Sequence, residues 1–428
     1  MKEQIKSGEF YDELEGMPRR EREEYYNRRL QQQVKYAYEN APAMRAKFDE
    51  AGVTPSDIRT IKDMERIPIT TKDQLIDLRK ANPPWGGLLG VPPERLQKVF
   101  MSPGPIYDAG SISDDFYRRW AKAYHAGGFR KGDLVVNTWS YHMVPAGHWM
   151  EEGLRRLGCT VIPMGVGNTE LQVQVLQDMK VTGWVGTAGF FMIIVNKAEE
   201  LGYDVRRDFA LRVVAAGLEM AGGPMRRLFE EKYGFITCDQ YGTADVGAVA
   251  YECSETSGMH ICEEVLVEIV DPNTGKQLAP NEVGEVVVTP FDETYPLIRF
   301  GTGDLSSYVD ELCPCGRTSL KLTRIMGRVG DAVRTRGMFI HPRQISEVAS
   351  KFPQISRYQA VVTRPQFRDE LVVKIELADE TIDREKLMAA FGKNFQDVCR
   401  LRVDRFEFVP KGTIPEGAKA IVDERVYE

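Results

Sequence analysis

Residues 160–187 read TVIPMGVGNTELQVQVLQDMKVTGWVGT, and their pattern is the strongest indication of the fold class. Residues 160–163 form a short apolar run typical of a strand, and residues 170–179 read as a helix. A second apolar run at residues 183–187 completes a strand–helix–strand unit. Alternation of this kind indicates a parallel sheet flanked by helices.

The same alternation continues on both sides of this unit. Residues 134–136 and 211–215 are further strand candidates, and residues 225–232 read as a helix. We therefore predict an α/β fold with a parallel sheet for this part of the chain.

Two other regions have different patterns. Residues 20–50 are predicted to be helical, because apolar side chains recur at the spacing of one helix face: Leu30, Val34, Ala37 and Tyr38. Residues 265–270 and 284–290 are strand-like and are separated by the turn sequence DPNTG at residues 271–275. This pattern predicts a hairpin-type β subdomain.

A domain boundary is predicted beside the Gly327-Arg328 pair, giving a large N-terminal domain (1–328) and a small C-terminal domain (329–428). The C-terminal part has an α+β pattern, with helices at 342–351 and 384–398 and strands at 358–363, 371–377 and 401–409. Apolar residues alternate along 371–377, so one face of that strand should be buried.

Composition restricts the function classes. A chain of 48.5 kDa with net charge −7 and a pI near 5.6 lacks the basic character that nucleic acid or an anionic membrane would require. The first residues, MKEQIKSGEF, contain no hydrophobic signal segment, so we expect a cytoplasmic protein. The seven cysteines suggest metal ligands and buried thiols rather than disulfides.

The sequence PKGTIPEGAK at residues 410–419 places Lys419 on a loop rich in glycine and proline. A lysine on such a loop is a mobile point charge with three donors, suited to stabilising charge on an acyl-phosphate. The alternative is a solvated lysine near a frayed chain end.

Together these features resemble the phenylacetate–coenzyme A ligase family of adenylate-forming enzymes. The resemblance covers nearly the whole chain and rests on QYGTAD (240–245), RFGTGD (299–304), Gly327-Arg328 and the Lys419 loop. Further matching segments are QVKYAYENAPAMRAKFDEA (33–51), IPITTKDQL (67–75), VIPMGVGNTELQ (161–172), Glu252-Cys253, His260 and CPCGRT (313–318). The resemblance implies a large adenylate-forming domain and a small, mobile C-terminal lid.

The resemblance also implies a reaction. ATP with Mg²⁺ would activate a carboxylic acid, most simply an aromatic or aryl-acetic one, to an acyl-adenylate. Coenzyme A would then form the thioester. Two alternatives stay open: an enzyme that loads a carrier protein, and a relative that binds adenylates or acyl groups without turning over ATP.

Several residues are implied to bind the nucleotide. Tyr241 is the candidate platform for adenine, since a flat ring stacks on a purine, and Gly242 would let the backbone approach the ligand. Asp304 is the candidate ribose clamp, and Arg328 would reach the ribose or the α-phosphate. The remaining candidates are Thr243 and the loop residues Gly217 and Glu219. Each of these segments could instead be an ordinary turn.

The other implied roles concern metal, catalysis and motion. Asp245 stands where the family has a glutamate that holds magnesium, and it is one methylene shorter. Lys419 and Arg328 are the expected catalytic residues. Gly330 is the expected hinge, whose freedom in φ and ψ would allow domain rotation. An ordinary interdomain linker glycine is the alternative.

One stretch departs from the family. Residues 101–110 read MSPGPIYDAG, where relatives carry a Ser/Thr/Gly-rich phosphate loop that ends in Gly-Lys. The stretch contains no lysine, and its two prolines remove two backbone donors. Either other groups hold pyrophosphate, or the protein handles ATP poorly.

Four residues could hold a structural zinc ion: Cys253, His260, Cys313 and Cys315. Cys262 is a rival ligand, and buried free thiols are the alternative to any metal. A zinc-ribbon module that binds nucleic acid or protein would leave the Lys419 loop unexplained.

Tyr141 and His142 follow a predicted strand and are expected to line the acyl pocket. The predicted partners are therefore a small carboxylic acid, ATP and coenzyme A, without nucleic acid or membrane. The sequence leaves open the identity of the acid and whether the protein is a monomer or a homodimer.

Overall fold

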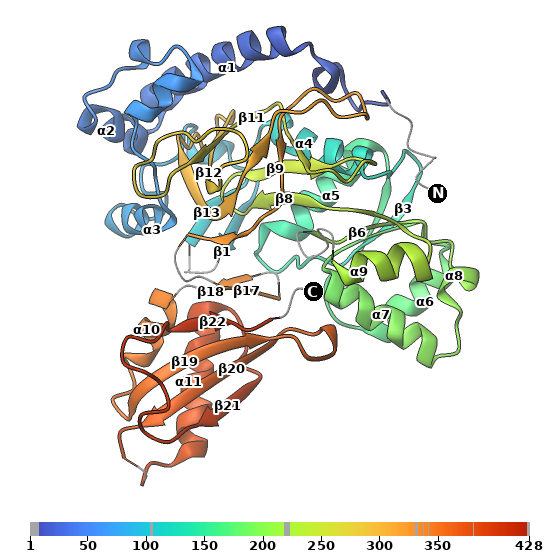
Figure 1. Ribbon diagram of the computed structural model, residues 1–428, viewed down its shortest axis with the longest axis vertical. Coiled ribbons are helices and arrows are strands. Elements are labelled where there is room, and N and C mark those ends of the chain that lie inside the picture. The colour runs from blue at the N-terminus through green and yellow to red at the C-terminus, as the bar shows by residue number, and fades with distance from the viewer. Residues whose placement is uncertain are drawn as a thin grey trace. The chain divides into compact units, whose positions relative to one another are not determined.

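The structure, a computed structural model, describes residues 8–102, 106–217, 223–329, 333–336, 338–340, 342–379 and 381–425. The chain divides into two compact units (Figure 1). One unit comprises Met1–Ser102 and Tyr107–Gly327, and the other comprises Pro103–Ile106 and Arg328–Glu428. Glu219 and Gly330, two of the predicted site residues, lie outside the described residues.

A five-stranded parallel sheet lies in the larger unit, in the order β4-β3-β5-β6-β7. Its strands are β3 (Leu134–Asn137), β4 (Thr160–Pro163), β5 (Gly183–Val185), β6 (Val213–Ala215) and β7 (Ile236–Cys238). The helices before and between these strands are α4 (Asp114–Ala126), α5 (Pro145–Leu157), α6 (Thr169–Asp178), α7 (Ala188–Glu200), α8 (Val205–Asp208) and α9 (Pro224–Arg227), and a π-helical turn, Leu228–Lys232, follows α9. The parallel sheet and the strand–helix–strand unit at residues 160–187 are thereby confirmed.

The middle strands of this sheet are apolar because both of their faces are covered. Trp184 of β5 has no exposed surface, and its ring lies 4.6 Å from that of Phe191 on α7. Full burial of an aromatic side chain of this size contributes about 2–3 kcal/mol. A β-carbon on the neighbouring Gly183 would lie 2.7 Å from the ring of Phe129, so only glycine allows that ring to pack against the strand.

Two antiparallel sheets accompany the parallel one. The first has the order β14-β15-β10-β9-β8, and the second has the order β11-β12-β13-β16. Their strands are β8 (Gln240–Thr243), β9 (Gly247–Glu252), β10 (Met259–Ile261), β11 (Val265–Val270), β12 (Gly284–Pro290), β13 (Phe300–Ser306), β14 (Tyr308–Val309), β15 (Lys321–Leu322) and β16 (Gly327–Arg328). β11 pairs with β12 from Val265 opposite Pro290 to Val270 opposite Glu285, which confirms the predicted hairpin.

The amino-terminal helices pack on the core that these two sheets share. Residues 20–50 form two helices rather than the single predicted one, α1 (Arg19–Asn40) and α2 (Pro42–Glu50). Pro42 lacks a backbone N–H and restricts the residue before it, so Ala41 is extended and the helix breaks there. Leu30, Val34 and Ala37 are fully buried, as their spacing predicted.

The other elements of this region are shorter. They are α3 (Lys72–Ala81), the paired strands β1 (Val99–Ser102) and β2 (Ile106–Ala109), and the turns η2 (Glu13–Gly16), η3 (Pro55–Asp57), η4 (Ile61–Arg66) and η5 (Pro93–Arg95).

The smaller unit contains a four-stranded sheet in the order β21-β20-β19-β22. Its elements are β17 (Val333–Thr335), β18 (Met338–Ile340), α10 (Pro342–Ala349), β19 (Ile355–Thr363), η8 (Pro365–Phe367), β20 (Glu370–Leu377), α11 (Arg384–Cys399), β21 (Arg405–Phe408) and β22 (Ile421–Asp423). This α+β architecture was predicted, but β22 was not. β22 pairs in parallel with β19, with Ile421 opposite Ala360.

None of the helices in the described part of the chain is both long enough and apolar enough to cross a bilayer.

Candidate active site

The segment that leads into α3 is joined to β13. Thr70 forms a parallel bridge with Phe300. The N–H of Thr70 donates to the carbonyl of Arg299 at 2.8 Å, and the N–H of Gly301 donates back to Thr70 at 3.0 Å. Residues 67–75 and 299–304, two of the segments selected from the sequence, are therefore neighbours in space.

The side chain of Arg299 links these segments through hydrogen bonds and an ion pair. Its side chain is buried, forms an ion pair with Glu268 at 3.0 Å, and donates to the carbonyls of Ile67 and Gly275, each at 2.7 Å. A lone buried cation would be strongly unfavourable, so this set of partners makes the residue structural. Arg299 fixes the start of β13 rather than facing a ligand.

Asp304 lies on β13 and is almost fully buried. The hydroxyl of Tyr241, on β8, donates to Asp304 Oδ2 at 2.8 Å. Thr302 Oγ1 lies 3.1 Å from the same hydroxyl, and the Asp304 N–H donates to that Oγ1 at 3.1 Å. The structure thus brings the predicted adenine residue and the predicted ribose residue into direct contact.

This contact changes the role expected of Tyr241. The residue has no exposed surface, so its ring offers no open face for a purine in this conformation. A buried tyrosine hydroxyl that donates to a carboxylate fixes the orientation of that carboxylate. The geometry therefore supports Tyr241 as a positioning residue for Asp304 rather than as a stacking platform.

The two residues after Tyr241 shape the turn between β8 and β9. A β-carbon on Gly242 would lie 2.6 Å from the carbonyl oxygen of Gly247, so glycine is needed for the close approach of β9 and not for the approach of a ligand. Thr243 Oγ1 accepts from the N–H groups of Asp245 and Val246 at 3.3 and 3.4 Å. Thr243 thereby holds the turn that carries Asp245.

Asp245, the predicted magnesium ligand, forms an ion pair with Lys72 at the start of α3. Lys72 Nζ lies 2.6 Å from Asp245 Oδ1, and the side chains of the two residues are 24% and 7% exposed. Mg²⁺ needs oxygen ligands, and one carboxylate already compensated by an ammonium is a poor dedicated site for it. Asp245 alone is therefore a poor site for magnesium in this arrangement.

A second ion pair lies in the last turn of α3. Arg79 Nη2 is 3.0 Å from Asp108 Oδ1 on β2, and it also donates to the hydroxyl of Tyr295. Burial raises the pKa of Tyr295 well above its usual value, and the charges of Arg79, Asp108 and Asp245 also act on it. Tyr295 therefore lies within the fields of both ion pairs.

A ligand-binding position is also expected at the carboxyl ends of the parallel strands. The order β4-β3-β5 means that the chain leaves β3 in one direction and β5 in the other, and ligands of open α/β sheets bind at such a point. Trp139 follows β3, and a β-carbon on Gly217, after β6, would lie 3.6 Å from its ring. The Trp139 indole nitrogen has no acceptor among the described residues.

Tyr141 and His142, the predicted pocket walls, differ in their surroundings. Tyr141 is half-buried, its hydroxyl accepts from Asn137 Nδ2 at 2.8 Å, and its ring contacts that of His148 edge-on at 5.1 Å. His142 is exposed. Of the two, Tyr141 is the residue that the fold holds in a defined position.

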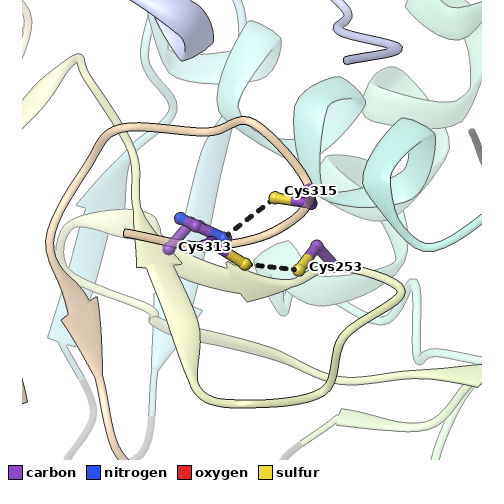
Figure 2. Close-up of side chains that lie close together, drawn as sticks. Cys253, Cys313 and Cys315 are labelled. Carbon is purple, nitrogen blue, oxygen red and sulfur yellow. Dashed lines mark hydrogen bonds between the residues drawn. The ribbon is translucent and has the colours of Figure 1, made fainter. Parts of the chain in front are cut away.

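The four predicted zinc ligands lie together, and all are buried. Figure 2 shows the three cysteines of this group side by side. The ligand atoms of Cys253, His260, Cys313 and Cys315 lie within 4.8 Å of one another. Cys253 Sγ is 3.6 Å from Cys313 Sγ, and Cys315 Sγ is 3.5 Å from His260 Nε2. Tetrahedral zinc with ordinary bond lengths would separate two sulfurs by about 3.8 Å and a sulfur from a nitrogen by about 3.6 Å.

The surroundings of these residues also suit a metal. Ser319 Oγ lies 3.3 Å from His260 Nδ1, so the outer ring nitrogen has a partner while Nε2 faces the cysteines. A hydrogen bond with Cys253 and another with His260 lower the pKa of Cys315, which favours its thiolate, and the same bond raises the pKa of Cys253. The rival ligand Cys262 does not join this group.

Lys419 and Arg328 belong to the smaller unit. Lys419 is exposed and directly precedes Ala420 and β22, and its carbonyl accepts from Gln359 Nε2 at 3.1 Å. Arg328 ends β16 and is half-buried.

Sequence reasoning missed three residues of this site: Lys72, Arg79 and Trp139. Lys72 lies in IPITTKDQL (67–75), a segment that matches the family, but its partner Asp245 is 173 residues away. Only the position of Trp139, two residues after the end of β3, could have signalled its role.

Comparison with known proteins identifies relatives that cover most of the chain. Residues 337–425 match a family described as the AMP-binding enzyme C-terminal domain. The phenylacetate–coenzyme A ligase of Thermus thermophilus is 33% identical over 382 residues, covering 86% of this chain and 84% of the relative. The Escherichia coli K12 enzyme of the same name is 35% identical over 369 residues, covering 83% and 82%.

A solved structure extends the comparison to the fold. The 2-hydroxyisobutyryl-CoA ligase, crystallised with 2-HIB-AMP and CoA, superposes with a TM-score of 0.91 at 27% identity. The match covers 96% of this chain and 91% of that one.

Proposed function

This chain belongs to the phenylacetate–coenzyme A ligase family, and from that premise we propose the acid that it activates and the residues that act on it. The enzyme is an AMP-forming acid–coenzyme A ligase. A carboxylate oxygen attacks the α-phosphorus of ATP, and pyrophosphate leaves with the electron pair of the broken P–O bond. The thiol of coenzyme A then adds to the acyl carbon, and AMP leaves.

The proposed substrate is an aromatic or aryl-acetic acid. One observation carries this proposal: Trp139 and Tyr141 lie where β3 ends, at the point where ligands of such sheets bind. Aromatic walls favour edge-to-face and stacked contacts with an aromatic acyl group. His142 is a proposed outer wall of the same pocket.

The proposed nucleotide contacts follow the family motifs. Asp304 accepts from the ribose hydroxyls while Tyr241 fixes its orientation, and Gly217 and Glu219 line the adenine side. Gly242 and Thr243 act through the turn that they build. Magnesium enters with ATP, and Asp245 is the carboxylate proposed to lie nearest to it.

The proposed catalytic residues belong to the C-terminal part. Residues 329–428 act as a lid that turns about Gly330, so that Lys419 reaches the α-phosphate during adenylation and withdraws before thioester formation. Arg328 contacts the ribose or the α-phosphate. Support comes from the match of residues 337–425 to the C-terminal domain family of AMP-binding enzymes.

Zinc is proposed as a structural ion held by Cys253, His260, Cys313 and Cys315. Four protein ligands leave no open position for a catalytic water, so the ion would have no part in either half-reaction.

The experiment that tests the function supplies ATP, coenzyme A and a panel of aromatic, aryl-acetic and short aliphatic acids. AMP release with aryl-acetic acids above all others is the expected result, and a Trp139→Ala variant should raise KM for those acids more than for aliphatic ones. AMP release with aliphatic acids alone would contradict the proposed substrate. No AMP release with any acid would favour a binding protein.

A further inference from the structure

Helix α3 presents two cations on one face. Lys72 and Arg79 are seven residues apart, close to two full turns, so their side chains project from the same side about 10 Å apart along the axis. Lys72 pairs with Asp245 at 2.6 Å, and Arg79 pairs with Asp108 at 3.0 Å.

This face lies beside segments assigned to ATP. Lys72 follows Thr70 by two residues, and Thr70 is bridged to the strand that carries Asp304. Asp245 is four residues beyond Tyr241, whose hydroxyl contacts Asp304. Asp108 belongs to residues 101–110, the stretch that replaces the phosphate loop and contains no lysine.

Arg79 has unused donors. Its side chain is 7% exposed, yet Nε and Nη1 have no acceptor among the described residues. A buried donor without an acceptor is destabilising, and more so when the group is charged, so such a group usually has an acceptor from water or a ligand. Phosphate oxygens are acceptors that match the planar fork of a guanidinium.

Lys72 is the more accessible of the two. About a quarter of its side chain is exposed, and Asp245 holds the ammonium at the turn after β8. An ammonium in that position can share its three donors between the carboxylate and a bound anion. The residue therefore has both the charge and the access that a phosphate contact requires.

Resting on the proposed ATP-dependent function, we propose that α3 supplies the cations of the pyrophosphate site, with Lys72 and Arg79 contacting the β- and γ-phosphates. When the bond between the α-phosphorus and its bridging oxygen breaks, that oxygen leaves on pyrophosphate with the electron pair. Both cations stay protonated, and each shares its positive charge between its carboxylate partner and the leaving pyrophosphate. Helix α3 thus supplies the positive charge that, in relatives, comes from the lysine at the end of the phosphate loop.

The test is titration calorimetry of the full chain with ATP, with inorganic pyrophosphate and with AMP. Lys72→Gln keeps an N–H donor for Asp245 but removes the charge. Affinity for ATP and pyrophosphate should fall on the order of tenfold, whereas affinity for AMP should not change. Arg79→Lys should weaken the same two ligands, because it keeps the charge but loses the fork.

The matched control is Lys80→Gln. Lys80 directly follows Arg79 on the same helix and is exposed, so this variant should bind all three ligands like the wild type. The inference is overturned if Lys72→Gln binds ATP normally, or if it loses AMP and ATP equally. A wild-type protein that binds ATP but releases no AMP would contradict the proposed function alone, since these affinities test α3 without turnover.

Discussion

The hydroxyl of Tyr241 donates to Asp304 Oδ2 at 2.8 Å across 63 positions of sequence, inside a buried site. The bond ties the strand β8 to the strand β13. Tyr241 and Asp304, which belong to separate sequence motifs, therefore act together. The hydroxyl of Tyr241 holds the Asp304 carboxylate in one orientation.

Asp304→Ala should weaken ATP binding by on the order of tenfold or more, because a hydrogen bond to a charged group contributes about 1.5–3 kcal/mol. Tyr241→Phe keeps the buried ring and removes only the orienting bond, so its loss should be smaller, roughly fivefold. Calorimetry with ATP measures both. Unchanged affinity in a folded Asp304→Ala protein would place the ribose elsewhere.

Lys419→Ala should affect the two half-reactions unequally. A preorganised donor at developing charge is worth about 3 kcal/mol, so ATP–pyrophosphate exchange should fall by roughly a hundredfold. Conversion of a supplied acyl-adenylate to thioester should persist.

Lys411→Ala is the matched control, since this lysine lies on the same loop and donates to the carbonyl of Ala378. Equal losses of both half-reactions in Lys419→Ala would contradict an alternating lid.

Metal analysis should find about one zinc per chain. Cys313→Ser should lower zinc content and Tm together, and activity should fall only as folded protein is lost. Cys262→Ser removes a buried thiol outside the group and should keep its zinc. Stable protein without metal would show that these residues are buried thiols, and a folded, inactive Cys313→Ser protein would make the metal catalytic.

Stability should fall in mild acid because of His125. Burial, together with the nearby charges of Arg130 and Arg317, lowers the pKa of this imidazole from 6.5 to about 4. The unfolded chain therefore binds a proton at this imidazole more readily than the folded chain does. The stability that the neutral His125 contributes is complete above pH 6.5 and is lost as the pH falls toward 4.

His125→Gln isolates this contribution from those of other groups. Tm measured between pH 7 and pH 4.5 should fall less steeply in the variant than in the wild type. Parallel curves for the two proteins would show that His125 does not titrate differently on folding.

The sequence alone predicted the helices and strands that can be recognised from the spacing of apolar residues within one short segment. The run at residues 160–187 predicted its own strands and helix, because two short strand-like runs flank a helical segment. Of these two strands, only β5 is buried along its whole length, and β4 is a partly exposed edge strand. The single helix predicted over residues 20–50 was wrong at Pro42, because the spacing of Leu30, Val34 and Ala37 supports only the part before that proline. β22 is three residues long, too short to show a period.

The site was predictable as a set of motifs but not as a set of contacts. Tyr241 was expected to stack, since its motif does not reveal that β8 is buried. Gly242 was assigned to ligand approach because the partner that requires it, Gly247, becomes a neighbour only when β9 pairs. The cations of α3 were missed because their partners come from distant segments.

The cluster of Cys253, His260, Cys313 and Cys315 joins segments that are far apart in sequence. Cys253 and Cys313 are 60 positions apart, and the chain between them includes β11, β12 and Asp304. A metal ion bound at both ends would close this chain into a ring. A ring has fewer conformations than an open chain, so an ion retained by the unfolded protein would reduce the entropy gained on unfolding. A bound zinc ion would then stabilise the segment that contains β13 partly through its effect on the unfolded chain, in addition to the contacts that it makes in the folded protein.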